Sequence, residues 1–147
     1  MIAALLGITL AVPVGGDQTD RSGSAPIGKS VRVAGIVLKW IPGDRAGNYR
    51  RAERLIREAA GNGANIVSTA ESFLDGYAVR DSSIGADEFR SLAEPIPNGS
   101  YIGRLRRLAD ELDIYLVAAI SELAGDRVYN SAALIGPNGK LDRKSVV

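Results

Sequence analysis

The chain has 147 residues, of which 46% are hydrophobic and 24% are charged, a mixture that suits one globular domain and excludes a disordered tail. Its 18 Lys and Arg residues balance 17 Asp and Glu residues to a net charge of +1, so no strong field recruits nucleic acid or an acidic membrane. The sequence contains no His and no Cys, which excludes Ser-His-Asp and Cys-His catalysis, zinc ribbons and disulfides among these residues.

Residues 1–30 are predicted to be a signal-like apolar segment followed by a polar linker. The apolar run over residues 2–14 is shorter than the roughly 20 residues that span a bilayer, so we expect no membrane span. It has the length of a signal peptide's hydrophobic region, which predicts a secreted or periplasmic protein. No Lys or Arg precedes the run, so an N-terminal strand in a cytoplasmic protein stays open as the alternative.

The folded domain is expected to occupy residues 31–147 and to begin with a strand over residues 31–38. Asp44 then caps a predicted amphipathic helix, in which apolar residues recur every three or four positions up to Ala60. The sequence Gly61-Asn62-Gly63 ends this helix, because these residues tolerate the left-handed conformation of a helix C-terminus. A second strand is predicted over residues 64–70.

The second half of the domain begins with a long loop over residues 73–97, in which we expect at most short helical turns. Ser100 is predicted to cap a second helix, whose apolar face consists of Ile102, Leu105, Leu108, Ala109 and Leu112. The unbroken apolar run over residues 114–120 predicts a strand covered on both faces.

A last strand is predicted over residues 128–135, followed by a turn at Asn138-Gly139. Only residues 140–147 are left to form the partner strand, so we expect a domain that is cut off at its C-terminus. The order of elements predicts an α/β fold whose sheet begins parallel and continues as an antiparallel hairpin.

Two glutamates, Glu71 and Glu122, follow predicted strands, and reactive groups in α/β folds collect at strand ends. Burial after an apolar strand would favour the protonated form of Glu71 and suit it to work as a general base. From its position in the sequence, Glu71 could also cap a helix or form a salt bridge. Glu122 precedes a turn, so its side chain could simply be solvated.

Several segments resemble the nitrilase superfamily of carbon-nitrogen hydrolases. Residues 63–77, GANIVSTAESFLDGY, resemble its "GA-(D/N)-hydrophobic, E-x-F-x-x-GY" segment, and residues 31–37 with Asp44 and Asn48 resemble its first strand and helix start. Residues 116–122 and 128–132 resemble its "strand, E, turn, YN-(S/T)-A" hairpin, and residues 136–141 its "P-(D/N)-G-K" turn. The resemblance covers nearly everything after residue 30.

The resemblance implies a partial αββα sandwich and a Glu-Lys-Cys triad that hydrolyses a non-peptide amide, nitrile or carbamoyl bond of a small molecule, without a cofactor or metal. Glu71 matches the catalytic glutamate. With a short deletion Lys144 matches the catalytic lysine, whereas an ungapped reading places Val147 there. Because no Cys is present, we expect a fragment of a truncated or frameshifted hydrolase that is inactive alone and forms homo-oligomers through exposed apolar surface.

Two other functions remain open. Glu71 and Glu122 could form the acid and base of a glycosidase-like site, although the aromatic residues that stack on sugars are scarce. Alternatively, the chain could be a non-catalytic sandwich module that acts by association.

Overall fold

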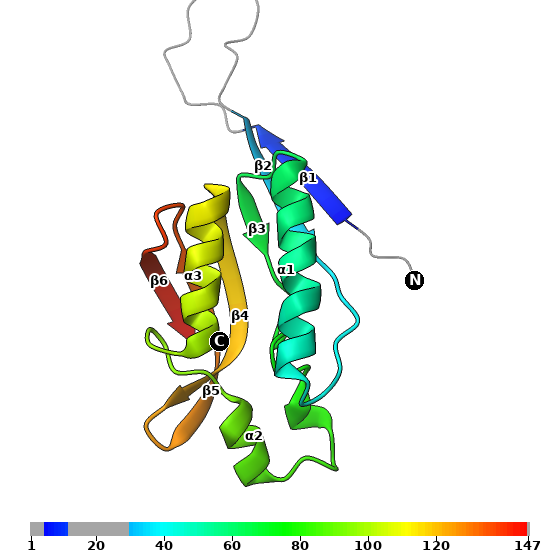
Figure 1. The fold of residues 1–147 in the computed structure, drawn as a ribbon, viewed down its shortest axis with the longest axis vertical. Coiled ribbons are helices and arrows are strands. Elements are labelled where there is room, and N and C mark those ends of the chain that lie inside the picture. The colour runs from blue at the N-terminus through cyan, green and yellow to red at the C-terminus, as the bar shows by residue number, and fades with distance from the viewer. Residues whose placement is uncertain (1–4, 12–29, 147) are drawn as a thin grey trace, which may run out of the picture.

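A computed structural model describes residues 5–11 and 30–146 (Figure 1). These residues form one six-stranded sheet with two long helices, and the strands follow one another across the sheet in chain order. The strands are β1 (Leu5–Ala11), β2 (Ser30–Ile36), β3 (Ile66–Ser68), β4 (Tyr115–Ala124), β5 (Arg127–Ile135) and β6 (Leu141–Val146). The helices are α1 (Arg45–Gly61), α2 (Ala86–Leu92) and α3 (Ser100–Leu112), with a short 3₁₀ turn, η1 (Ala78–Arg80).

The sheet is parallel in the middle and antiparallel at both ends, as the sequence predicted for its C-terminal half. β2, β3 and β4 are parallel, and β4, β5 and β6 form an antiparallel meander. β1 pairs antiparallel with β2 at the other edge, so residues 5–11 adopt the strand that the sequence left open. The predicted cleavage region and linker over residues 12–29 lie outside the described residues. No helix within the described part of the chain is long and apolar enough to cross a bilayer.

Helix α1 forms as the sequence predicts. The Asp44 carboxylate accepts a hydrogen bond of 2.9 Å from the Gly47 backbone N–H, which satisfies one of the free donors of the first turn. The helix buries Ala52, Leu55, Ile56 and Ala59 against the sheet. Its end at Gly61 is followed by Gly63 at φ +84°, the left-handed position that glycine tolerates.

The predicted cap of α3 is wrong. Ser100 is already the first helical residue, Gly99 holds the N-cap position, and neither caps the helix through a side chain. The buried Glu94 carboxylate accepts the backbone N–H groups of Tyr101 and Ile102 instead, at 2.5 and 3.3 Å. A side chain at position 99 would collide with that carboxylate, because its Cβ would lie 2.2 Å from Glu94 Oε1.

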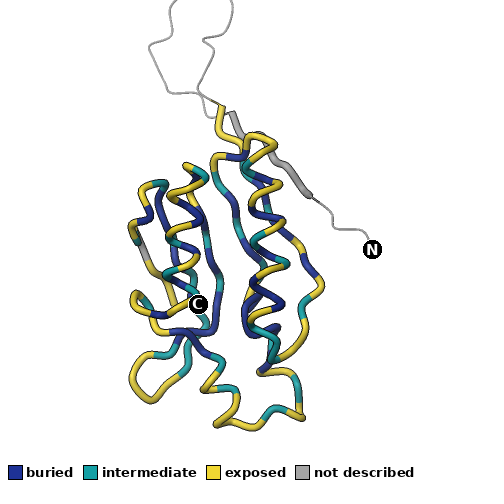
Figure 2. The backbone as a smooth tube through the Cα atoms, viewed as in Figure 1, coloured by how far each residue is buried: buried dark blue, intermediate teal, exposed yellow. Residues whose placement is uncertain are grey.

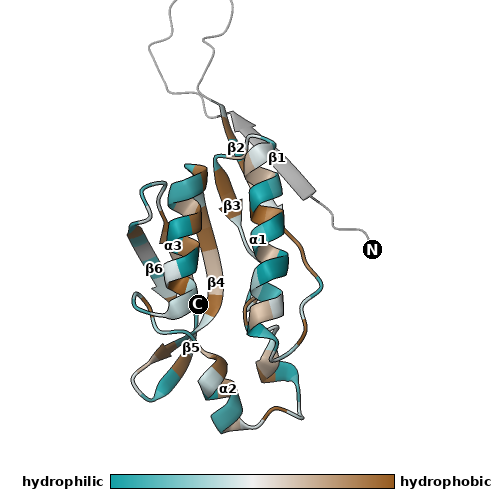
Figure 3. Cartoon of the chain, viewed as in Figure 1, coloured by the Kyte–Doolittle hydropathy of each residue, from teal (hydrophilic) through white to brown (hydrophobic). Residues whose placement is uncertain are grey.

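Strand β4 is covered on one face only, which corrects the prediction of a strand covered on both. Leu116, Ala118 and Ile120 are buried, whereas Val117 is half-buried and Tyr115 is 43% exposed. Figure 1 shows the reason, since α1 and α3 lie side by side on the same face of the sheet. Figure 3 shows β3 and β4 as apolar strands behind the mixed surfaces of these two helices.

Two further boundaries differ from the predictions. β3 has three residues rather than the seven predicted, because Ala64 still closes the end of α1 and the chain turns away after Ser68. The loop over residues 73–97 contains the seven-residue helix α2, which is longer than the short turns expected. Figure 2 shows that α2 is mostly exposed, and it has no buried residue.

β6 provides the partner strand that the Asn138-Gly139 turn requires.

Candidate active site

Glu71 begins a tight turn three residues beyond the end of β3. Its carboxylate accepts a hydrogen bond from the Tyr77 hydroxyl, at 2.9 Å, and another from Asn130 Nδ2 on β5, at 2.6 Å. The side chain is exposed in this chain, so the burial expected from the sequence is absent. The two hydrogen bonds orient the carboxylate while leaving it accessible.

The turn that carries Glu71 is conformationally strained. Ser72, Gly76 and Tyr77 all have positive φ, at 46°, 72° and 59°, and two of them are not glycine. The backbone N–H groups of Gly76 and Tyr77 both donate to the Ser72 carbonyl, which closes the turn, and Phe73 and Leu74 anchor it in the core. Left-handed residues other than glycine persist where the surroundings fix them, and they concentrate at functional sites.

Tyr77 connects the turn to a neighbouring cavity. The hydrogen bond to Glu71, reinforced by the carboxylate charge, raises the pKa of the Tyr77 hydroxyl above its ordinary value. The Tyr77 ring stacks on Trp40, with centroids 6.3 Å apart and planes at 23°. Both rings line an open cavity of about 430 Å³, together with Pro42, Gly76, Arg80, Asp81 and Ser82. A substrate group could therefore lie beside the aromatic pair, one hydrogen bond away from Glu71.

Glu122 is buried rather than solvated, which corrects the sequence-based alternative. It is 1% exposed, because β4 continues to Ala124 and Glu122 projects from the same face of β4 as the buried Ala118 and Ile120. Its carboxylate accepts hydrogen bonds from Ser131 Oγ, at 2.6 Å, and from Lys144 Nζ, at 2.8 Å. The Lys144 amine thus neutralises a carboxylate that burial would otherwise make costly.

The structure does not join Glu71 to the pair of Glu122 and Lys144. Glu71 is held by Asn130 and Glu122 by Ser131, and successive residues of a strand point to opposite faces of the sheet. Within the described residues, Lys144 forms its ion pair with Glu122 and none with Glu71. Val147, the ungapped alternative for the lysine, lies outside the described residues. The two carboxylates are not arranged as the facing pair that a glycosidase needs.

Sequence reasoning missed Tyr77 and Asn130 as partners of Glu71. Both residues belong to segments that carry the family resemblance, Tyr77 to the GY end and Asn130 to the YN pair, so the motifs contained the signal. Their contact with Glu71 could not be inferred locally, because Asn130 is 59 residues away. Among the described residues, no group of three or more Asp and Glu side chains is placed to hold a metal ion.

Comparison with known proteins gives consistent matches. A model of the carbon-nitrogen hydrolase family matches residues 32–146. The chain is 40% identical over 113 residues to human omega-amidase NIT2, covering 76% of this chain and 38% of the relative. It is 38% identical over 92 residues to a Pyrococcus abyssi nitrilase, and 36% over 96 residues to Arabidopsis thaliana N-carbamoylputrescine amidase. These matches cover 63% and 65% of this chain, and 34% and 31% of the relatives.

Solved structures agree. Saccharomyces cerevisiae Nit3, a member of the nitrilase superfamily, superposes with a TM-score of 0.67 at 26% identity, over 85% of this chain and 46% of Nit3. The XC1258 protein of Xanthomonas campestris superposes with a TM-score of 0.63 at 21% identity, over 76% of this chain and 38% of that protein. These superpositions confirm the predicted nitrilase-type α/β fold. The chain spans about a third of the length of the curated relatives it matches.

Proposed function

This chain belongs to the carbon-nitrogen hydrolase family, and from that premise we propose that it supplies the general base of a site that hydrolyses a non-peptide amide, nitrile or carbamoyl bond. The observation that carries the proposal is Glu71, which matches the family's catalytic glutamate and is held by Tyr77 and Asn130 with its carboxylate accessible. The names of the relatives, which include nitrilase, omega-amidase and N-carbamoylputrescine amidase, support the same bond class.

In the proposed mechanism for an amide, Glu71 accepts the proton of a cysteine thiol, and the resulting thiolate attacks the carbonyl carbon. The carbon-nitrogen bond then breaks, and the nitrogen takes the proton from Glu71 and leaves as ammonia or an amine. Glu71, ionised again, next accepts a proton from water, whose oxygen attacks the thioester; the acid is released, and the thiolate takes the proton back from Glu71. The 147 residues contain no Cys, so these residues alone provide the base and not the nucleophile.

For the lysine, we propose Lys144, the position that matches the family's lysine when a short deletion is allowed. In the described residues its amine pairs with Glu122 on the sheet face away from Glu71, so Lys144 has to leave that ion pair to stabilise an intermediate formed at Glu71. Its side chain is 38% exposed, which leaves the amine accessible for that movement. Val147 is the competing position, and it would supply no amine.

A chimera tests the role of Glu71. Residues 31–139 of this chain, joined to the part of human omega-amidase that follows its counterpart of Gly139, should regain the cysteine and the lysine of the triad. We expect this chimera to release ammonia from amide substrates, and we expect Glu71→Gln to reduce turnover by about 10³-fold or more, since a base acting on two proton transfers is lost. Glu88→Gln, an exposed glutamate of α2, is the matched control and should leave turnover unchanged.

Two comparisons complete this test. The natural chain should release no ammonia above the blank, and Glu71-dependent hydrolysis by it would contradict the proposed inactivity. A second chimera keeps this chain through Val147 and therefore lacks the lysine segment of omega-amidase. It should be active if Lys144 serves as the catalytic lysine, and inactive if Lys144 does not. Full activity of Glu71→Gln in the first chimera would refute the role of Glu71.

A non-catalytic module that acts by association remains the second candidate. The observation that favours it is the sheet face opposite the helices, where apolar residues such as Val31 on β2 and Tyr115 on β4 are 38% and 43% exposed. In that case Glu71→Gln would change neither the oligomeric state nor any binding property of the chain.

A further inference from the structure

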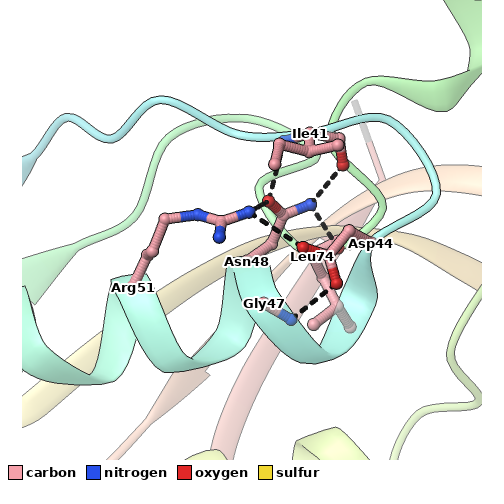
Figure 4. Close-up of polar contacts among 6 residues, drawn as sticks. All are labelled: Ile41, Asp44, Gly47, Asn48, Arg51 and Leu74. Atoms are coloured by element: carbon pink, nitrogen blue, oxygen red, sulfur yellow. Dashed lines mark hydrogen bonds and ion pairs between the residues drawn. The ribbon is translucent and has the colours of Figure 1, made fainter.

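Asn48, in the first turn of α1, is fully buried and uses its whole carboxamide (Figure 4). Its Nδ2 donates to the Ile41 carbonyl, at 2.8 Å, and to the Leu74 carbonyl, at 3.1 Å. Its Oδ1 accepts from the Ile41 N–H, at 2.8 Å, and from Arg51 Nη2, at 2.9 Å. Asparagine offers two donors and two acceptor positions, so all of its hydrogen-bonding capacity is used.

These bonds join two loops that are far apart in sequence. Ile41 belongs to the turn that follows β2, and Leu74 belongs to the strained turn between Glu71 and Tyr77. Two more contacts hold the same loops together, because the Gly43 N–H donates to the Asp75 carbonyl at 2.9 Å, and Gly76 packs on Ile41. A Cβ at Gly76 would lie 2.4 Å from the Ile41 carbonyl oxygen and 2.9 Å from Asn48 Nδ2.

The position of Leu74 matters because it lies in the middle of the turn that carries Glu71. Ser72 and Tyr77 hold left-handed conformations on either side of it, and neither is a glycine. Such conformations relax unless their neighbours fix them. The Asn48 side chain is a rigid helix-borne group that fixes the Leu74 carbonyl, and Tyr77, three residues on, donates to the Glu71 carboxylate.

From this arrangement we propose that Asn48 is a positioning residue for Glu71. Its donor group holds the Leu74 carbonyl, and this sets the turn in which the Tyr77 hydroxyl reaches the Glu71 carboxylate. The same residue fixes Ile41, next to Trp40, and so sets the aromatic pair against the cavity. The catalytic meaning of this role rests on the proposed function of Glu71 as the base, whereas the positioning itself is measurable in this chain without any activity.

The first experiment measures the titration of Tyr77 in the full chain. Tyrosine labelled with ¹³C at Cζ reports each hydroxyl by NMR, and Tyr77→Phe assigns the signal. In the natural chain, Tyr77 should titrate above the ordinary midpoint, and Glu71→Gln should return it to about pH 10. Asn48→Asp has the same shape and keeps both acceptor contacts, but it has no donor for the Leu74 carbonyl. We expect it to return Tyr77 to the same ordinary midpoint, and Asn48→Ala to do so as well.

The control separates positioning from general loss of stability. Leu108→Ala removes buried side-chain volume from α3, outside both loops, and should leave the Tyr77 midpoint at its raised value. If Asn48→Ala does not melt cooperatively, Asn48→Asp decides the result. A Tyr77 midpoint in Asn48→Asp equal to that of the natural chain would overturn the positioning role.

The second experiment uses the chimera joined after residue 139. Asn48→Asp should lower kcat at least 10-fold and change KM less, since the base is misplaced while the nucleophile remains. If Glu71→Gln leaves the chimera fully active, the proposed function fails, but the Tyr77 titration still decides the positioning role. If Glu71→Gln abolishes turnover and Asn48→Asp leaves kcat unchanged, the positioning role fails alone.

Discussion

At the residue scale, the hydrogen-bond partners of each acidic side chain determine its role in this fold. Glu71 accepts from a hydroxyl and an amide and stays exposed, whereas Glu122 accepts from a hydroxyl and an amine and is buried. Asp44 accepts hydrogen bonds from the Gly47 backbone N–H and from Arg51, and its bond from Gly47 caps the N-terminus of α1. The residue type is nearly the same in each case, so the partners decide whether the carboxylate is left accessible, buried in an ion pair or used to cap a helix.

The capping role of Asp44 predicts a pH dependence. Its hydrogen bond from Gly47, followed by the bond from Arg51, lowers the pKa of Asp44 below 3.8 in the folded state. The stability that it contributes is therefore complete above pH 3.8 and is lost as the pH falls through the lowered pKa. Asp44→Asn keeps an acceptor for Gly47 but cannot titrate, so urea unfolding at pH 6 and pH 3 should show a smaller loss in this variant. Asp126→Asn, in the exposed turn between β4 and β5, is the control, and equal losses in all three proteins would contradict the prediction.

At the scale of elements, the first turn of α3 is capped by Glu94, a residue that lies outside the helix. Glu94 is 2% exposed, caps the first turn of α3 and forms an ion pair with Arg45 on α1. The Arg45 guanidinium also lies over the Tyr101 ring, 4.7 Å from its centroid. The Glu94 backbone pairs with β4, since its N–H donates to the Ser121 carbonyl and its carbonyl accepts from the Leu123 N–H. One residue thus joins both long helices to the central strand.

We therefore predict that Glu94→Ala lowers the free energy of unfolding by about 3 kcal/mol or more, because it leaves a half-buried guanidinium and a helix end without their partner. Glu94→Gln should cost less, since it still accepts from the first turn of α3. Glu53→Ala removes an exposed pair on α1 and should cost about 0.5 kcal/mol. Urea unfolding compares the three variants, and a loss in Glu94→Ala no larger than that in Glu53→Ala would rule out the joining role.

At the scale of the whole molecule, the helices cover one face of the sheet and the described residues leave the other face half exposed. Val117 on β4 lies opposite Leu134 on β5, and both are half-buried apolar residues on that face. Contiguous apolar surface of this kind promotes association. The curated relatives are about three times longer than the segment that this chain matches, so in them further residues are available to cover such a face.

This surface predicts self-association of the chain. Size-exclusion chromatography with light scattering should show a mass above that of one chain, increasing with concentration. Replacing Val117 and Leu134 by Thr should shift the protein toward the monomer, because it removes apolar area from this face and keeps the β-propensity. Val79→Thr is the control, since Val79 is 60% exposed but lies in η1. A monomer at every concentration would show that the exposed face does not drive association.

The sequence by itself determined what depends on neighbouring residues. The spacing of apolar residues and the ends at Asp44 and Gly61 specify α1, the turn at Asn138-Gly139 specifies the last hairpin, and the motif around Glu71 specifies the family. Only the tertiary structure decided that Glu122 is buried against Lys144, that Glu94 rather than Ser100 caps α3, and that β4 is covered on one face. The reason is physical: Lys144 is 22 residues from Glu122, and Glu94 reaches the first turn of α3 from a loop seven residues before Tyr101, so the periodicity within one element carries no record of either contact.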